Sequence, residues 1–175
     1  MSNLKSDRRS AAQIIERAIS ALRPYPRNAR THSKKQIKQI ARSIERFGFT
    51  NPVLISDDGE IIAGHGRVAA AKLLGLETVP TLSLSHLSDA ERRAYILADN
   101  KLALNAGWDQ EILAIELQGL IDLDFDVELT GFSLAEIDFT LDAARDADPT
   151  VKDASADAVP AIKGPPVSRQ GDLWL

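Results

Sequence analysis

Residues 51–75 constrain the fold most, because they predict a strand, a tight turn, a second strand and a helix in immediate succession. Two β-rich apolar runs, 51–56 and 60–63, flank Asp57-Asp58-Gly59, which is typical of a hairpin turn. Gly64-His65-Gly66-Arg67 follows the second run and opens a helix that Gly75 ends. Another strand is expected at 78–84, so we interpret the stretch as a βαβ-like unit.

The glycine-rich junction is the strongest candidate for a binding site. The first N–H groups of a helix have no intrahelical acceptor and carry partial positive charge. Gly64 and Gly66 would let a phosphate approach the backbone closely, and Arg67 could hold it with two hydrogen bonds. His65 could bind phosphate or transfer a proton. The alternative is a turn required only for tight packing, with Arg67 as a surface charge.

The charge of the chain is divided unevenly. Residues 1–48 carry 12 Lys or Arg and 3 Asp or Glu (12 − 3 = +9), whereas the rest carries 9 and 22 (9 − 22 = −13). A helix is predicted for 34–47, with Ser33 as N-cap, Gln36 at the capping-box position and Gly48 as its end. The polar surface of this helix is basic and carries Lys34, Lys35, Lys38, Arg42 and Arg46. It predicts either a DNA-binding face or a solvated helix surface.

A second basic element precedes this helix. Residues 11–21 could form a short helix or a strand, and LRPYPRNARTH follows with prolines at 24 and 26. Proline fixes its own φ and restricts its predecessor, so an extended loop is expected. Arg23, Arg27 and Arg30 on this loop suit an anionic ligand. A solvated loop is the alternative.

Asp99 and Asn100 lie within a helix predicted from Ser88 to about Leu104, where both residue types are poor helix formers. Their oxygens suit Mg²⁺ beside a phosphate. The alternative is helix-end chemistry ahead of Asn105 and Gly107. His65 and Asp99 are the candidate catalytic residues, although the catalytic set is unknown. Two more helices are expected after Asp109 and Ser133.

Composition excludes several classes of protein. The chain has no cysteine, which excludes disulfides, thiolate zinc sites and cysteine nucleophiles. The N-terminus lacks the apolar region of a signal peptide, and no apolar run approaches the ~18 residues of a membrane span. We therefore expect a cytoplasmic protein with no membrane partner. The expected layout is a flexible start (1–18), a domain (19–107), a helical extension (108–145), a linker (146–170) and the start of a missing downstream domain (171–175).

Taken in order, five motifs resemble the N-terminal domain of the ParB/sulfiredoxin superfamily: LRPYPRNAR, IKQIARSIERFGFTNPVLI, IIAGHGRVAAAKLLGL, VPTL and ILADNKLAL. The resemblance implies an α+β (mixed α/β) fold, a small mixed sheet flanked by helices, here with a C-terminal helical extension. It also implies that Gly64, His65, Gly66 and Arg67 take the places of a Gly-Glu-Arg-Arg loop that grips the triphosphate of CTP. Only the first Gly and the last Arg are retained.

The same resemblance aligns Asp99 and Asn100 with the family's Glu-Asn-x-x-Arg helix, which helps to hold Mg²⁺ and phosphate. CTP or another nucleotide with Mg²⁺ is thus the implied cofactor. Sulfiredoxin's reductase chemistry needs a cysteine that this chain lacks. Partition ParB proteins continue into a helix-turn-helix domain, whereas acidic amphipathic helices without a basic recognition helix are expected here.

The whole pattern, with GPPVSRQGDLWL at its end, resembles the leader of prophage-type DNA methyltransferases. S-adenosylmethionine would then bind only to the missing downstream domain. The leading hypothesis is a ParB-like accessory domain that binds phosphate of a nucleotide or of DNA, with DNA, the methyltransferase domain and a second copy of the chain as partners. The alternatives are a Mg²⁺-dependent nucleotidase, nuclease or kinase-type enzyme, and an interaction module that uses the acidic helices 109–145.

Overall fold

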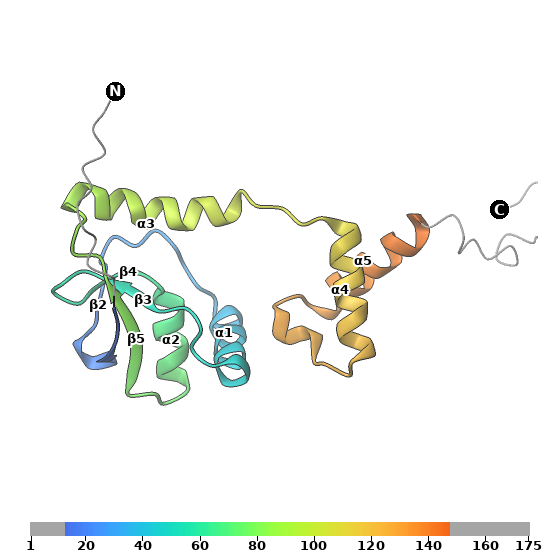
Figure 1. The fold of residues 1–175 in the computed structure, drawn as a ribbon, viewed down its shortest axis with the longest axis horizontal. Helices are drawn as coiled ribbons and strands as arrows, with labels where there is room; N and C mark the ends of the chain where they lie inside the picture. The colour runs from blue at the N-terminus through green and yellow to red at the C-terminus, as the bar shows by residue number, and fades with distance from the viewer. Residues whose placement is uncertain (1–12, 148–175) are drawn as a thin grey trace, which may run out of the picture.

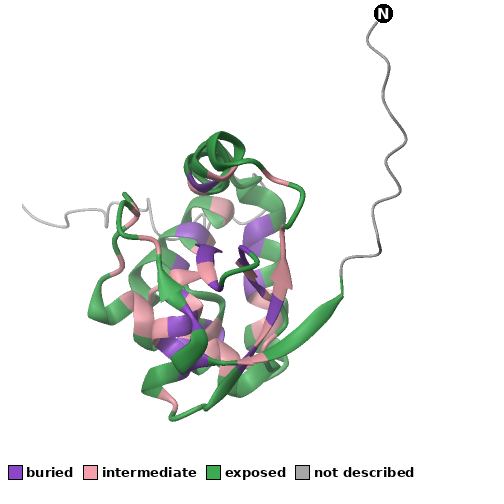
Figure 2. Ribbon diagram, turned by 90° about the vertical axis from the view of Figure 1, so that its left-hand side faces the viewer, coloured by how far each residue is buried: buried purple, intermediate pink, exposed green. Residues whose placement is uncertain are grey.

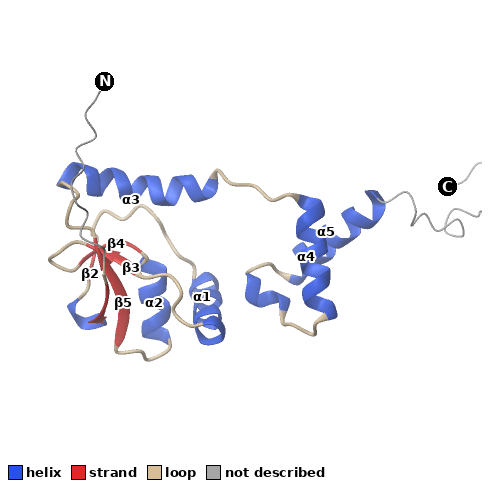
Figure 3. Ribbon diagram, in the orientation of Figure 1, coloured by secondary structure: helices blue, strands red, loops and turns tan. Residues whose placement is uncertain are grey.

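The computed structural model describes residues 13–147, which form two units with separate hydrophobic cores. The strands gather in the N-terminal unit, and the C-terminal unit consists of helices (Figure 3). Residues 105–109 join the two units (Figure 1). The expected flexible start up to residue 12, the linker from residue 148 and the segment 171–175 lie outside the described residues.

A five-stranded mixed sheet organises the N-terminal unit, and it confirms the predicted fold class. Its strand order is β1-β5-β3-β4-β2. The strands are β1 (Ile14–Ala18), β2 (Arg23–Pro24), β3 (Val53–Ile55), β4 (Glu60–Ala63) and β5 (Thr78–Ser83). β3 pairs antiparallel with β4 and parallel with β5, and the edge strand β2 runs parallel to β4.

The hairpin prediction is confirmed, but the βαβ-like interpretation is wrong. β4 and β5 are not neighbours, because β5 pairs with the other side of β3. The parallel pair is therefore β3 and β5, and β4 lies within the crossover between them.

The ordered domain also begins earlier than the predicted residue 19. All five residues of β1 pair antiparallel with β5, and the Thr81 hydroxyl donates to the Ile15 carbonyl at 2.7 Å. This pairing orders residues 14–18, which the sequence assigned to a flexible start. A short 3₁₀ turn, Ile19–Ala21, then leads to β2.

The helices of this unit begin where their caps predict. α1 (Lys34–Phe47) starts at Ser33, whose hydroxyl accepts the Gln36 N–H at 3.1 Å, and ends at Gly48. The Gln36 side chain does not complete the predicted capping box and hydrogen-bonds to the His32 ring instead. α3 (Asp89–Leu104) has both halves of its box, from Ser88 and Glu91.

The N-terminal core fixes the end of β4 and the first turns of α2 (His65–Leu73). Buried residues concentrate in the middle of this unit (Figure 2), and its core cluster contains Ile19, Leu22, Val53, Ile55, Ile61, Val68, Ala71 and Val79. α1 and α2 lie side by side, and α3 runs across the unit, with Ile96 as its buried residue (Figure 1). The strand-to-helix junction at Gly64 is therefore held from both sides.

The C-terminal unit is built from α4 (Gln110–Asp122), the 3₁₀ helix η2 (Val127–Thr130) and α5 (Leu134–Ala147). Leu113, Leu117, Val127 and Ile137 form its core. Residues 110–147 contain ten Asp or Glu and one Arg, a net charge of −9. Within residues 13–147, no helix combines the length and apolarity that crossing a bilayer requires.

Candidate functional site

The N-terminus of α2 presents unsatisfied backbone N–H groups. Gly64 caps the helix with φ +102°, a left-handed conformation that favours glycine. The first helical hydrogen bond runs from the Val68 N–H to the Gly64 carbonyl at 3.0 Å. The N–H groups of residues 65–67 precede this bond, and the first turn carries no acidic residue. This end of the helix therefore attracts anions.

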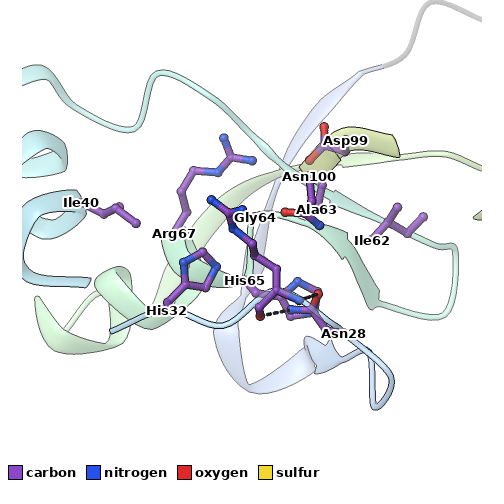
Figure 4. A pocket seen from close by; sticks show the side chains of 12 residues that line it. Asn28, His32, Ile40, Ile62, Ala63, Gly64, His65, Arg67, Asp99 and Asn100 are labelled. Carbon is purple, nitrogen blue, oxygen red and sulfur yellow. Dashed lines mark hydrogen bonds between the residues drawn. The ribbon is translucent and has the colours of Figure 1, made fainter. Parts of the chain in front are cut away.

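These N–H groups border a cavity of about 170 Å³, which brings together residues from distant parts of the chain (Figure 4). The loop before α1, the end of β4, the start of α2 and the middle of α3 all contribute. The lining residues are Asn28, Arg30, His32, Ile40, Ile62, Ala63, Gly64, His65, Gly66, Arg67, Asp99 and Asn100. The cavity thus contains the complete junction 64–67 that the sequence singled out, together with Arg30, Asp99 and Asn100.

Arg67 brings a half-buried guanidinium to the cavity. Its guanidinium lies over Gly64, so that a Cβ at Gly64 would come within 2.9 Å of Arg67 Nη2. Its Nε is buried and has no hydrogen-bond partner among the described residues. Burial lowers the pKa of Arg67, and the negative charge of Asp99 opposes part of that effect. A buried donor without an acceptor is costly, and a bound anion would satisfy it.

His65 connects the start of α2 to the arginine-bearing loop. Its Nε2 accepts a hydrogen bond from the Tyr25 N–H at 3.2 Å, which requires a lone pair on that nitrogen. Burial, and secondarily the charge of His32, lowers the pKa of His65. His65 is therefore held neutral, and the nitrogen that meets Tyr25 is occupied. This arrangement fits a tether between loop and helix better than the predicted acid or base.

Of the three loop arginines, only Arg30 lines the cavity. Arg23 belongs to β2 at the sheet edge and forms an ion pair with Asp58 in the hairpin turn. Arg27 is exposed and lies outside the lining. The parallel pairing of β2 with β4 holds Arg23 at the sheet edge, and no local sequence signal predicts that pairing.

Two residues that the sequence analysis left out also line the cavity. Asn28 holds Arg30, because its Oδ1 accepts the Arg30 N–H and its Nδ2 donates to the Arg30 carbonyl, both at 3.2 Å. An Asn side chain often hydrogen-bonds to the backbone two residues later and thereby forms a turn. Asn28, two residues before Arg30, is therefore a signal that the sequence already contains. His32 comes from the same loop, and its position in the cavity lining follows only from its contact with Gly66 in the folded structure.

Asp99 and Asn100 reach the cavity from α3, as predicted for a site beside phosphate. The Asn100 amide donates to the Ile96 carbonyl at 2.8 Å, which fixes the side chain against its own helix. In the described part of the chain, no three His, Cys, Asp or Glu side chains gather as metal ligands. A Mg²⁺ ion at this position would need oxygens from a bound phosphate as well.

The predicted DNA-binding residues are all exposed on α1, but two of them already have partners. Arg42 forms a 2.7 Å ion pair with Asp126. The Arg46 guanidinium lies 5.4 Å from the centre of the Phe125 ring. Both partners belong to the acidic C-terminal unit, so the C-terminal half of the basic face contacts that unit. Lys34, Lys35 and Lys38, in the N-terminal half, form no ion pair within residues 13–147.

The neutral state of His65 predicts how stability depends on pH. The pKa of His65 is lowered in the folded state. As the pH falls below the ordinary pKa of about 6.5, His65 is therefore protonated in the unfolded chain but stays neutral in the folded chain. Stability should therefore fall between pH 7.5 and 5.5. A His65→Gln variant keeps an acceptor for the Tyr25 N–H and should lose less stability over this range in urea unfolding.

The exposed His86 supplies the control, since His86→Gln should follow the wild-type pH profile. Asp58, Glu91 and Glu136 do not interfere in this window, because serine hydrogen bonds keep the pKa of each below its ordinary value. Equal losses in the wild type and His65→Gln would show that His65 is not held neutral.

Comparison with known proteins gives matches over both units. The ParB N-terminal domain family matches residues 3–101. The ParB-methyltransferase HTH domain matches residues 111–170, which corrects the expectation that no helix-turn-helix domain follows. A basic recognition helix is the usual sequence signal of such a domain, and residues 110–147 lack it because they are acidic.

Individual relatives match the first unit. The ParB-like nuclease domain-containing protein YnaK of Escherichia coli is 52% identical over 81 residues, which is 46% of this chain and 93% of YnaK. The chromosome-partitioning protein Spo0J of Thermus thermophilus is 30% identical over 96 residues, and stage 0 sporulation protein J of Bacillus subtilis is 33% identical over 95. These matches cover 53% and 52% of this chain but only 35% and 33% of the two relatives.

A solved structure supports the fold. The C-terminally truncated ParB of Caulobacter crescentus, complexed with CTP-gamma-S, superimposes with a TM-score of 0.61 at 24% identity. The match covers 74% of this chain and 77% of that one. With the family match over more than half of its length, the chain belongs to the ParB N-terminal domain family.

Proposed function

We propose that this chain is a DNA-associated accessory domain whose α2 cavity binds phosphate of a nucleotide or of the DNA backbone. One observation carries the proposal, namely the buried Arg67 Nε, which has no partner among residues 13–147 and lies beside the open N–H groups of α2. Arg30 adds a second cation to the cavity lining. Such an arrangement attracts an anion through charge and hydrogen bonds together.

A nucleotide with Mg²⁺ is the ligand that this cavity suits best. The Caulobacter ParB structure with a similar fold holds CTP-gamma-S, which makes CTP the first candidate. Mg²⁺ usually keeps several waters and takes one or two carboxylates together with substrate phosphates. Asp99 and Asn100 supply one carboxylate and one amide oxygen to the cavity lining, so their chemistry fits an ion that arrives with the nucleotide.

The DNA contact is assigned to α1. Lys34, Lys35 and Lys38 lie exposed near its N-terminus, and phosphate contacts of this kind provide affinity and orientation without reading the bases. The match of residues 111–170 to the ParB-methyltransferase HTH domain favours a methyltransferase as the protein that this domain serves. S-adenosylmethionine would bind to that methyltransferase domain, and self-association stays a prediction.

A second candidate function is Mg²⁺-dependent hydrolysis of nucleotides or nucleic acid. The presence of Asp99 beside Arg67 favours it, because a carboxylate near a phosphate-binding arginine is the arrangement that metal-assisted hydrolysis uses. The printed name of YnaK, a ParB-like nuclease domain-containing protein, points the same way.

The phosphate proposal predicts that Arg67→Ala weakens CTP binding and Arg23→Ala does not. A hydrogen bond to a charged group contributes about 1.5–3 kcal/mol, so Arg67→Ala should cost about 10- to 100-fold in affinity. Titration calorimetry with CTP, ATP, ADP and GTP in the presence of Mg²⁺ measures it. Arg23 is the matched control, since it lies in β2 outside the cavity lining and is paired with Asp58. Equal losses in both variants would contradict the assignment.

The DNA proposal predicts weak, strongly salt-dependent binding to duplex DNA that improves when Asp126 is removed. Asp126→Ala releases Arg42 from an exposed ion pair, and such pairs contribute about 0.2–1 kcal/mol. Affinity at low salt should therefore rise about two- to five-fold. Fluorescence anisotropy over a salt series checks this, with Asp138→Ala as a control of equal charge change. No detectable DNA binding at low salt would exclude this role for α1.

The hydrolysis candidate predicts turnover that depends on the cavity. Phosphate release from CTP with Mg²⁺ should fall at least about tenfold in Asp99→Ala and in Arg67→Ala, because metal binding and charge stabilisation would each be lost. Measured rates that stay equal in the wild type and both variants would point to a contaminating enzyme and remove this candidate.

A further inference from the structure

The space above Gly66 is filled by the imidazole of His32. A Cβ placed on Gly66 would lie 3.1 Å from His32 Cε1, 3.2 Å from His32 Nδ1 and 3.1 Å from Ile40 Cδ1. Gly66 does not have the left-handed backbone that requires glycine at Gly64. Its missing side chain therefore serves to admit the neighbouring ring rather than to permit a turn.

The ring of His32 is held by one nitrogen and leaves the other available. His32 Nδ1 lies 3.1 Å from Gln36 Oε1, and an amide oxygen can only accept, so Nδ1 donates. This contact is the reason that Gln36 does not complete its capping box. Because Gln36 fixes the ring in the cavity wall (Figure 4), Nε2 is the nitrogen that can bind a ligand.

The charged groups around this nitrogen are mostly basic. Arg30 comes from the same loop, His65 and Arg67 come from α2, and Asp99 comes from α3. On α1, Ile40 and Gln36 contribute no charge. A bound phosphate would place negative charge beside the ring, which favours its protonated form.

We propose that His32 is a phosphate-binding residue of this cavity, which donates from Nε2 to the same phosphate as Arg67 and takes up a proton as that phosphate binds. The inference rests on the proposed phosphate-binding function and adds to it a ligand from the loop before α1. In this arrangement, Nδ1–H stays bonded to Gln36, and Nε2–H meets a phosphate oxygen. Loop and helix thereby close on the ligand from two sides.

The test measures CTP affinity in the presence of Mg²⁺ by calorimetry, using the full chain and its variants. His32→Ala and His32→Gln should each weaken binding by about tenfold, the effect of losing one hydrogen bond to a charged group. The exposed His86→Ala should bind as the wild type does. Circular dichroism checks folding, and His32→Gln keeps most of the side-chain volume should the alanine variant fail to fold.

Two further readouts separate ligand binding from packing. Wild-type titrations in buffers of different ionisation enthalpy should show more proton uptake per CTP bound than His32→Gln does. Gly66→Ala should weaken binding in the wild type because its Cβ displaces the ring, but should have little further effect in the His32→Ala background.

The outcomes distinguish this inference from the function on which it rests. CTP binding that is equal in the wild type and both His32 variants overturns the role of His32 and leaves the cavity proposal standing. Unchanged proton uptake in His32→Gln also overturns it, because a ring that only fills space takes up no proton. If neither CTP nor inorganic tripolyphosphate binds the wild type, the phosphate-binding function itself fails, and the inference fails with it.

Discussion

The guanidinium of Arg67 at the start of α2, with its buried Nε, is the constraint on which the site depends. Its Nε has no acceptor among residues 13–147, and the open N–H groups of the helix add positive potential beside it. A buried donor without an acceptor lowers stability unless a ligand or partner supplies one. The core around Ile61 and Val68 holds this arrangement in place, so the fold maintains a cationic cavity that an anion completes.

The C-terminal unit has the opposite electrostatic character. Its net charge of −9 opposes contact with phosphates, although its sequence matches a helix-turn-helix domain. In the structure it contacts the basic helix α1 through Arg42, Arg46 and the Gln39 side chain, which donates to the Gly131 carbonyl at 3.3 Å. Charge therefore pairs this unit with part of the basic α1 surface for which DNA binding is proposed.

Local signals predicted the elements well, because caps and turns act over a few residues. Ser33, Ser88 and Gly48 mark helix ends where the structure has them. What the sequence could not predict depends on pairing between distant segments. β2 joins β4 and takes Arg23 away from the cavity, and β5 crosses to the far side of β3. Gln36 matches a capping-box pattern, yet its side-chain oxygen accepts a hydrogen bond from His32 Nδ1 and does not complete the box.

The two histidines of the cavity illustrate the same limit in chemical terms. The sequence singled out His65 for its place in the glycine loop, but burial and the hydrogen bond from the Tyr25 N–H favour its neutral form. The charge of His32 lowers the pKa of His65 further. His32 uses Nδ1 for its contact with Gln36. Of the two rings, His32 is therefore the one whose Nε2 stays available to a phosphate, whereas the Nε2 of His65 is occupied by the Tyr25 N–H.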